Sequence, residues 1–332
     1  MPQNQQIVLA TRPDGAVKPE NFRLVETPMP QAGDGQLLLR HHWLSLDPYM
    51  RGRMDATKSY APNVALGDVM VGGVVGEVLE SKNAKFKVGD FVVGPLGWQL
   101  YSVSNGPGLT RVDSSVAPLS WYLGVLGMPG ITAWVGLIDI GGAKEGETVV
   151  VSAASGAVGS VVGQLAKLRG CRVVGIAGGP AKCGYCVTEL GFDACVDYKG
   201  GRLLEDLQAA TPKGVDVYFD NVGGEILDAV LTRMNPYSRI PLCGTISQYD
   251  TLTPYGIRNF RSFLVNRIML QGFIVSDRKA TWPQAIVELT QGVKDGRLKY
   301  RESIAQGLAS APAAFIGLLK GANFGKQVVR LS

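Results

Sequence analysis

The chain has 332 residues, more than one hydrophobic core usually serves, so its length favours two domains. Hydrophobic residues make up 46% and charged residues 18% of the chain, which is typical of a globular rather than a disordered protein. The net charge of +5 is spread along the sequence without blocks of Lys and Arg. This pattern argues against nucleic-acid and membrane-surface partners and indicates an ordinary polar surface.

Cysteine usage and the first residues bear on the compartment. Five cysteines, an odd number spread over a long chain, argue against a disulfide framework and for a reducing compartment. The polar start of the sequence does not resemble a signal peptide, and no apolar run reaches the length that spans a membrane. We therefore expect a cytoplasmic protein.

The first part of the chain, up to about Tyr122, is predicted to be rich in β-strands. Short apolar segments alternate there with turn clusters, such as those at residues 33–35 and 88–90. Residues 69–78 combine β-branched side chains with glycines, which predicts a strongly bent barrel strand.

From about Leu123 the pattern changes to short apolar runs that alternate with helical segments, which is typical of βαβ units around a parallel sheet. Six strands fit a doubly wound α/β sheet. The predicted strands are Thr148 to Ser152, Arg172 to Ile176, Ala194 to Val196, Val215 to Asp220, Arg239 to Cys243 and Met269 to Val275. The predicted helices are Val158 to Arg169, Lys182 to Leu190, Leu203 to Ala210, Glu225 to Leu231 and Trp282 to Asp295. We assign residues 123–296 to this domain, and residues 1–122 with 297–332 to the first.

A glycine-rich turn follows the first of these strands. It comprises Ala154, Ser155, Gly156, Ala157, Val158 and Gly159. Such a strand-to-helix turn lets backbone N–H groups and the positive end of a helix approach a pyrophosphate. Ala154 stands where the G-x-G-x-x-G pattern has its first glycine, so an ordinary tight turn is the alternative. The six-strand alternation favours dinucleotide binding.

The end of the second strand distinguishes NAD from NADP. An acidic side chain there would accept a hydrogen bond from the ribose 2′-OH, whereas a basic neighbourhood receives a 2′-phosphate. The sequence continues through Gly178 and Gly179 to Lys182 without an acid. Lys182 either pairs with the phosphate or is a solvated lysine at a helix start, and we favour NADP.

Metal ligands are sparse in the sequence. The two histidines, His41 and His42, are adjacent and would point to opposite faces of a strand. Cys183 and Cys186 form one C-x-x-C motif in a predicted helix, without a second ligand pair. We therefore predict no metal site.

Without zinc to polarise a carbonyl, hydroxyl groups, cations and backbone donors remain as electrophiles. Tyr49, Tyr60 and Tyr249 are the candidates, and amphipathic packing is the alternative for each of them. A Ser/His/Asp hydrolase is poorly supported, because the sequence contains no G-x-S-x-G elbow.

Several long motifs in the right order resemble the zinc-independent medium-chain dehydrogenase/reductase family, in its group of prostaglandin reductases, leukotriene hydroxydehydrogenases and alkenal double-bond reductases. The branch of bacterial NADPH-dependent curcumin reductases is the most similar. The similarity covers nearly the whole chain and rests on Leu46–Met54, Gly127–Trp134, Tyr218–Glu225, Cys243–Tyr249 and Gly321–Lys326.

The resemblance implies a Rossmann domain, a GroES-like domain completed by the C-terminal segment, and a homodimer. It places Ala154, Ser155, Ala157 and Val158 along the pyrophosphate, Lys182 and Tyr198 at the 2′-phosphate, and Asn221 beside the nicotinamide half. The rest of the implied cofactor wall is Cys243, Gly244, Thr245, Ile246, Ser247, Tyr249, Phe273, Ile274, Val275 and Asn323. Plant members carry a catalytic tyrosine where this sequence has about Val265, so that role is not transferred.

The resemblance implies NADPH-dependent reduction of the C=C bond of α,β-unsaturated ketones and aldehydes, such as curcumin- or alkenal-type substrates. Hydride would pass to the β-carbon, and Tyr249 or Tyr49 would donate to the substrate oxygen. Alternatives are an NADP-dependent secondary alcohol dehydrogenase, a quinone reductase, or an NADPH-binding protein without catalysis. Assays with simple enones and analysis of the product separate them.

Overall fold

The computed structural model describes residues 3–332, which divide into two compact units. One unit contains the chain up to Gly124 together with Glu302–Ser332, and the other is Val125–Arg301. The first unit is therefore built from two distant stretches of sequence, and the second from one continuous stretch. Across residues 3–332, the helices are all too short or too polar to cross a lipid bilayer.

The first unit is dominated by a seven-stranded sheet in the order β14-β15-β3-β4-β5-β7, with β6 also paired to β3. Only the β14–β15 pair is parallel. β1 and β2 form a separate antiparallel pair. The elements are β1 Gln3–Leu9, η1 Pro19–Asn21, β2 Phe22–Pro28, β3 Leu37–Ser45, α1 Tyr49–Arg53, β4 Val74–Ser81, β5 Phe91–Gly94, β6 Tyr101–Ser104, β7 Thr110–Val112, η2 Leu119–Leu123, β14 Glu302–Gln306, η6 Leu308–Ser310, α9 Ala311–Leu319 and β15 Lys326–Arg330.

The core of this unit joins the two stretches of chain through aromatic side chains. Phe22 stacks on Trp98 with ring centroids 5.5 Å apart, and the edge of Phe315 meets Trp98 at 5.7 Å. A β-carbon on Gly72 would lie 2.9 Å from the Trp98 ring, so the chain approaches that ring too closely for any side chain. Residues 69–73 contribute only an isolated bridge at Val69, and the regular strand predicted for this region begins at Val74.

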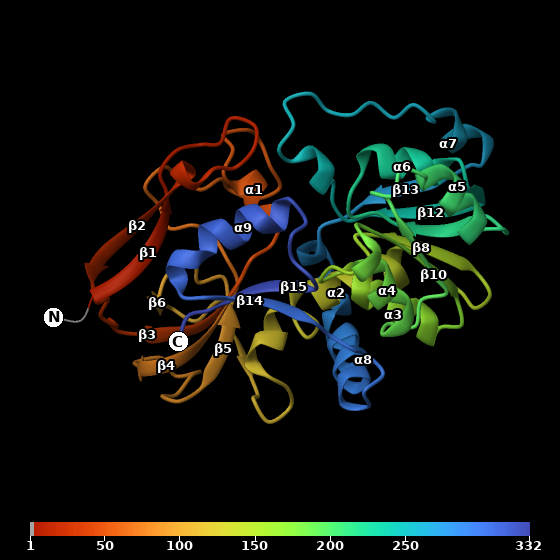
Figure 1. Cartoon of the computed structure of the whole chain (residues 1–332). Coiled ribbons are helices and arrows are strands. Elements are labelled where there is room, and N and C mark those ends of the chain that lie inside the picture. Colours follow the sequence, from red (N-terminus) through yellow and green to blue (C-terminus); the bar gives the residue numbers. More distant parts are fainter. Residues whose placement is uncertain (1–2) are drawn as a thin grey trace. The chain divides into compact units, whose positions relative to one another are not determined.

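The second unit is built on a parallel sheet of six strands in the order β10-β9-β8-β11-β12-β13. Figure 1 shows α5 and α6 over one face of this sheet, with α2, α3, α4 and α8 over the other. The elements are α2 Met128–Trp134, the π-helical turn η3 Val135–Ile140, β8 Thr148–Ser152, α3 Gly159–Leu168, β9 Arg172–Ala177, α4 Pro180–Thr188, β10 Ala194–Asp197, α5 Leu203–Ala210, β11 Val215–Phe219, α6 Gly224–Leu231, β12 Met234–Leu242, η4 Ile246–Gln248, α7 Arg261–Val265, β13 Met269–Gly272, η5 Val275–Thr281 and α8 Trp282–Lys294.

This strand order is that of a doubly wound dinucleotide-binding sheet. Together with the mainly antiparallel first unit, it confirms the predicted α/β class with a Rossmann and a GroES-like component. Most predicted strands and helices of this unit agree with the observed bounds to within two residues, and two elements differ by more. β12 begins at Met234 rather than Arg239, and the last strand ends at Gly272, after which the chain turns into a 3-10 helix instead of staying extended to Val275.

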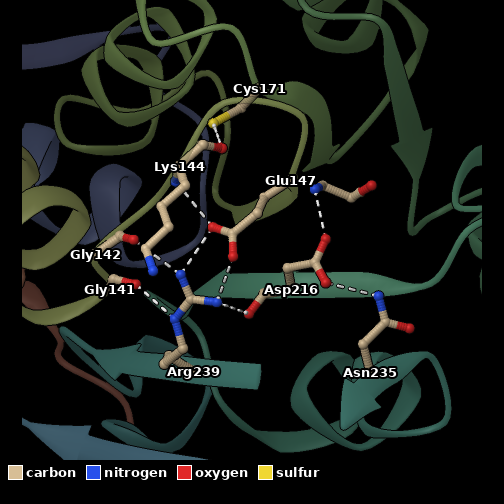
Figure 2. Close-up of polar contacts among 9 residues, drawn as sticks. Gly141, Gly142, Lys144, Glu147, Cys171, Asp216, Asn235 and Arg239 are labelled. Atoms are coloured by element: carbon tan, nitrogen blue, oxygen red, sulfur yellow. Dashed lines mark hydrogen bonds and ion pairs between the residues drawn. The ribbon is translucent and has the colours of Figure 1, made fainter. Parts of the chain in front are cut away.

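A polar cluster joins the three neighbouring strands β8, β11 and β12 (Figure 2). The guanidinium of Arg239 donates to both carboxylate oxygens of Glu147 at 2.8 Å and to the carbonyls of Gly141 and Gly142. Asp216 accepts from the backbone N–H of Thr148 and from the Asn235 amide, both at 2.8 Å. The Arg239 and Glu147 side chains are only 18% and 21% exposed, and their mutual hydrogen bonds offset the partial loss of solvent.

Candidate cofactor and active site

The turn after β8 has the geometry that a dinucleotide phosphate needs. β8 is fully buried, and its chain enters the turn at Ala153 with a φ of +49°. A β-carbon on Gly159 would lie 2.4 Å from the Ala153 carbonyl oxygen, so the start of α3 can approach β8 only because Gly159 lacks a side chain. The positive end of α3 therefore lies directly behind the turn.

The structure explains why Ala154 can replace the first glycine of the G-x-G-x-x-G pattern. Ala154 is fully buried, and its backbone N–H donates to the Ile176 carbonyl at 3.1 Å. A β-carbon on Gly175 of β9 would lie 2.8 Å from the Ala154 methyl group. The methyl thus points into the sheet, over a glycine that leaves room for it, and does not obstruct the outer side of the turn.

Lys199 and Tyr198 lie beside Gly178, directly after the carboxyl end of β9. A β-carbon on Gly178 would lie 3.0 Å from both Lys199 Cε and the Tyr198 hydroxyl. Burial, and after it the positive charge of Lys199, lowers the pKa of Lys182. A phosphate dianion between the two ammonium groups would relieve this repulsion and pair with both of them. The residues present therefore fit the 2′-phosphate of NADP.

Sequence reasoning missed Lys199 and Asp197, which both belong to this place. Asp197 Oδ1 accepts from the backbone N–H of Gly179 at 2.7 Å and from that of Lys199 at 3.0 Å. The Asp197 carboxylate thus joins the loop after β9 to the loop after β10 through backbone hydrogen bonds. The Tyr198-Lys199-Gly200-Gly201 turn after a predicted strand is the signal that could have indicated Lys199.

Asp220, directly after β11, organises the next loop. Its Oδ1 accepts from the backbone N–H groups of Val222 and Gly223 at 2.9 Å, from the Tyr218 hydroxyl at 2.8 Å and from the Ser152 hydroxyl at 3.2 Å. Burial raises the pKa of Asp220 although all four hydrogen bonds oppose this shift. One side chain thereby fixes the ends of β8 and β11 in relation to each other.

Tyr249 lies at the same edge of the sheet as Asn221. The Asn221 side-chain amide donates to the Ser152 carbonyl at 2.8 Å. A β-carbon on Gly244 would lie 3.2 Å from the Tyr249 hydroxyl and 3.5 Å from the Asn221 carbonyl oxygen. The phenol, the glycine and Asn221 therefore meet where β11 and β12 end, the edge at which parallel sheets bind their ligands.

The segment from Cys243 to Tyr249 is hydrogen-bonded to the turn after β11. The backbone N–H groups of Cys243 and Gly244 donate to the Asp220 carbonyl at 2.8 and 3.2 Å, and the Ser247 hydroxyl donates to the Val222 carbonyl at 2.6 Å. Burial raises the pKa of Cys243 to about 12, so this cysteine is a neutral thiol. Thr245 and Ile246 lie within the same segment, in and beside η4.

Phe273, Ile274 and Val275 follow β13 at this edge and are half-buried. The Phe273 ring meets Phe219 edge-on at 6.3 Å, and a β-carbon on Gly136 would lie 2.8 Å from it. The Phe273 side chain thus packs against the interior of the unit.

The other selected residues belong to the first unit. Tyr49 begins α1 and is half-buried, whereas Tyr60 is 60% exposed. Burial, and then the charges of Asp47 and Tyr60, raise the pKa of Tyr49, so its phenol remains a hydrogen-bond donor at neutral pH. Asn323 donates to the Gly325 carbonyl at 2.7 Å.

The predicted site residues therefore form two groups. The turn 154–159, Gly178, Lys182, Tyr198, Asn221, 243–249 and 273–275 all belong to the second unit and follow the carboxyl ends of its strands. Tyr49, Tyr60 and Asn323 belong to the first unit. Among residues 3–332, nowhere do three or more His, Cys, Asp or Glu side chains assemble into a group that could hold a metal ion.

The sheet order, the glycine-rich turn and the paired lysines define a dinucleotide-binding protein of the Rossmann type. Two family models match the chain: one described as the N-terminal domain of oxidoreductase, over residues 5–112, and one described as zinc-binding dehydrogenase, over residues 157–291.

Known proteins resemble the chain over its whole length. The NADPH-dependent curcumin reductase of Escherichia coli is 50% identical, covering 99% of this chain and 97% of that protein. The NADP(+)-dependent 2-alkenal reductase of Nicotiana tabacum is 41% identical over 99% and 98%. The crystal structure of CurA from Vibrio vulnificus in complex with NADPH is 48% identical, with a TM-score of 0.95 and 99% coverage of both chains. The chain belongs to the medium-chain dehydrogenase/reductase family, in the group that contains these reductases.

Proposed function

We propose that this protein is an NADPH-dependent reductase of the carbon-carbon double bond of α,β-unsaturated ketones and aldehydes. The observation that carries the cofactor assignment is Lys199 beside Gly178 together with the electrostatic interaction of Lys199 with Lys182, a site for a 2′-phosphate. The reaction is supported by the relatives, which are named as curcumin and 2-alkenal reductases and match the chain along nearly all of its length.

The residues of the second unit would hold the cofactor in three places. The outer side of the turn at residues 154–159, with the N-terminus of α3, would bind the pyrophosphate. Lys182, Lys199 and Tyr198 would bind the 2′-phosphate. Asn221 and the segment 243–249 would line the nicotinamide half. When bound, the reduced nicotinamide supplies the hydride that the reaction needs.

The protein's part in the chemistry is to hold the alkene and to stabilise negative charge on the carbonyl oxygen. Tyr249 would donate its phenol O–H to that oxygen, because this hydroxyl lies at the sheet edge where the nicotinamide half is expected. Tyr49, with Tyr60 near it, is the second candidate donor. Water can then protonate the α-carbon of the enolate.

The proposal also includes a homodimer, and it places the protein in the cytoplasm, which is a reducing compartment. β13 is the edge strand of the six-stranded sheet, and Met269 and Leu270 on it are 45% and 37% exposed. Phe260 and Leu264 of the adjoining segment are 68% and 78% exposed, so a second copy could pair along this apolar edge. None of the five cysteines forms a disulfide, which supports a reducing compartment.

The test is the loss of reduced-nicotinamide absorbance with a small enone such as 3-nonen-2-one, run in parallel with NADPH and NADH. Mass and NMR analysis then identifies the product. We expect the saturated ketone and a strong preference for NADPH. An allylic alcohol would show carbonyl reduction instead, and binding of NADPH without turnover would show a protein that is not a reductase.

A further inference from the structure

Three of the five cysteines come together between α4 and the strands β9 and β10. Cys183 and Cys186 lie on α4, and Cys195 on β10 forms side-chain hydrogen bonds with both of them. A β-carbon on Gly175 of the neighbouring strand would lie 3.1 Å from Cys195 Sγ, which places this sulfur over β9. The C-x-x-C motif thus gains a third thiol from a different element, and the assigned function uses none of the three.

Exposure and charge distinguish the three thiols. Cys186 is completely buried, whereas Cys183 and Cys195 are partly accessible. The hydrogen bond with Cys195 lowers the pKa of Cys183, while the same bond, that with Cys186, and burial raise the pKa of Cys195. Cys183 and Cys195 are therefore the two sulfurs of this cluster that a small oxidant in solution can reach.

The position of Cys183 connects this cluster to the cofactor. It follows Lys182 directly, in the first turns of a helix that begins at Pro180. The residue before that helix, Gly179, is held to the end of β10 by the 2.7 Å hydrogen bond to Asp197. Because Gly179 is held at Asp197, we expect a displacement of Cys183 towards Cys195 to shift the neighbouring Lys182 as well.

We propose that Cys183 and Cys195 form a reversible disulfide on exposure to a peroxide, and that this bond weakens the binding of NADPH by displacing Lys182. The inference rests on the proposed function, because it assigns the 2′-phosphate to Lys182. The sulfurs of Cys183 and Cys195 are now hydrogen-bonded and not covalently joined. A disulfide bond would bring them to about 2 Å from each other, so we expect the first turns of α4 to shift towards β10.

The chemistry balances with the peroxide as the only oxidant. The Cys183 thiolate attacks one peroxide oxygen and becomes a sulfenic acid, while the other oxygen leaves and, after protonation, is released as water. The Cys195 sulfur then attacks the sulfenic sulfur, its proton joins the departing hydroxyl as a second water, and the disulfide forms. A dithiol reductant reverses the bond by exchange.

The experiment oxidises the full-length protein with a small excess of hydrogen peroxide in the absence of cofactor. Intact mass and a non-reduced peptide map should show the loss of two hydrogens and a Cys183–Cys195 link. Calorimetric titrations before and after oxidation should show NADPH binding weakened by about tenfold, as expected for one lost charge-assisted contact, and NADH binding unchanged. Dithiothreitol should restore the original affinity.

Cys183→Ser and Cys195→Ser should each prevent both the link and the affinity change, whereas Cys171→Ser should behave like the parent protein because Cys171 lies outside the cluster. A link between Cys183 and Cys186, no link at all, or a Cys183–Cys195 link that leaves NADPH affinity unchanged would overturn the proposal. Titration of the reduced protein keeps the two proposals separate. If it shows no preference for NADPH over NADH, the cofactor assignment has failed, whatever the peptide map shows.

Discussion

The ammonium group of Lys326 donates to the carboxylate of Asp47 at 2.6 Å and to the carbonyl of Leu46 at 2.7 Å. Both side chains are almost completely buried, and the two residues are 279 positions apart in the sequence. Ser45 donates to the other oxygen of the same carboxylate. This pair ties β15 to the segment that leads from β3 into α1, and hence to Tyr49.

Replacement of Lys326 by Met is expected to destabilise the protein strongly. The substitution leaves the buried Asp47 carboxylate without its cation, which should lower the free energy of unfolding of the first unit by about 3–5 kcal/mol. Urea denaturation followed by circular dichroism measures this change. The double variant Lys326→Met/Asp47→Asn should recover part of the loss, because the uncompensated charge is gone. A single variant within about 0.5 kcal/mol of the parent would contradict the importance of the pair.

Replacement of Lys182 or Lys199 by Ala should change the choice of cofactor. Each substitution removes one cation from the place assigned to the 2′-phosphate, so the Kd for NADPH should rise by about tenfold or more while the Kd for NADH stays the same. Lys167→Ala is the matched control, since Lys167 pairs with Asp193 on the surface at 2.9 Å. Equal weakening of both cofactors would indicate a general structural effect and argue against the phosphate assignment.

Loss of the Tyr249 hydroxyl should slow the reaction without weakening the cofactor. Tyr249→Phe removes the proposed donor to the developing oxyanion, and we expect kcat with a simple enone to fall by about ten- to a hundredfold at an unchanged Kd for NADPH. Tyr237→Phe provides a control, because Tyr237 is 70% exposed and its ring lies under Arg267. If Tyr49→Phe reduces kcat and Tyr249→Phe does not, the donor is Tyr49.

The pH dependence of stability should contain a contribution from His41. Its ring is completely buried, with Nδ1 2.7 Å from the Gln99 carbonyl oxygen and Nε2 2.7 Å from the Ser102 hydroxyl. Burial is the main cause that lowers the pKa of His41 to about 3; the hydrogen bond to Gln99 opposes the shift, and the nearby His42 adds to it.

The sign of this effect follows from proton linkage. As the pH falls below the ordinary histidine pKa of about 6.5, His41 becomes protonated in the unfolded chain but stays neutral in the folded protein. The free energy of unfolding therefore decreases from about pH 6.5 towards about pH 3. Between about pH 6.5 and pH 5, the contribution of His41 should fall by about 1.6 kcal/mol. Urea titrations of the parent and of His41→Gln should therefore converge as the pH decreases. Parallel stability curves would show that His41 is not the residue responsible.

The second unit was largely predictable because its signals are local. The apolar run of β8 and the helical pattern of α5 gave the observed bounds, since both elements begin and end at turn residues. β12 was predicted too short, because Pro236 and the positive φ of Tyr237 interrupt the apolar pattern although the strand includes them. β13 was predicted too long, because the apolar residues after Gly272 continue into a 3-10 helix.

The contacts that depend on distant residues were not predictable. Lys199 became a candidate only when the structure placed it beside Gly178, and Cys195 when it met the C-x-x-C motif on α4. The pairing of Lys326 with Asp47 spans nearly the whole chain. No periodicity or turn chemistry indicates such partners in a single sequence, because the fold alone brings them together.

The arrangement of β15 between β14 and β3 has a consequence for synthesis on the ribosome. All of Val125–Arg301 has been translated before the chain reaches β14, so the second unit can complete its sheet while the first still lacks two strands. Until Arg330 has emerged, the Trp43–Ser45 end of β3 keeps an unpaired edge of the kind that attracts other strands, whereas Leu37–Arg40 already pair with β6. The unit that begins first is thus finished last, and it is the one that a chaperone would need to shield in the nascent protein.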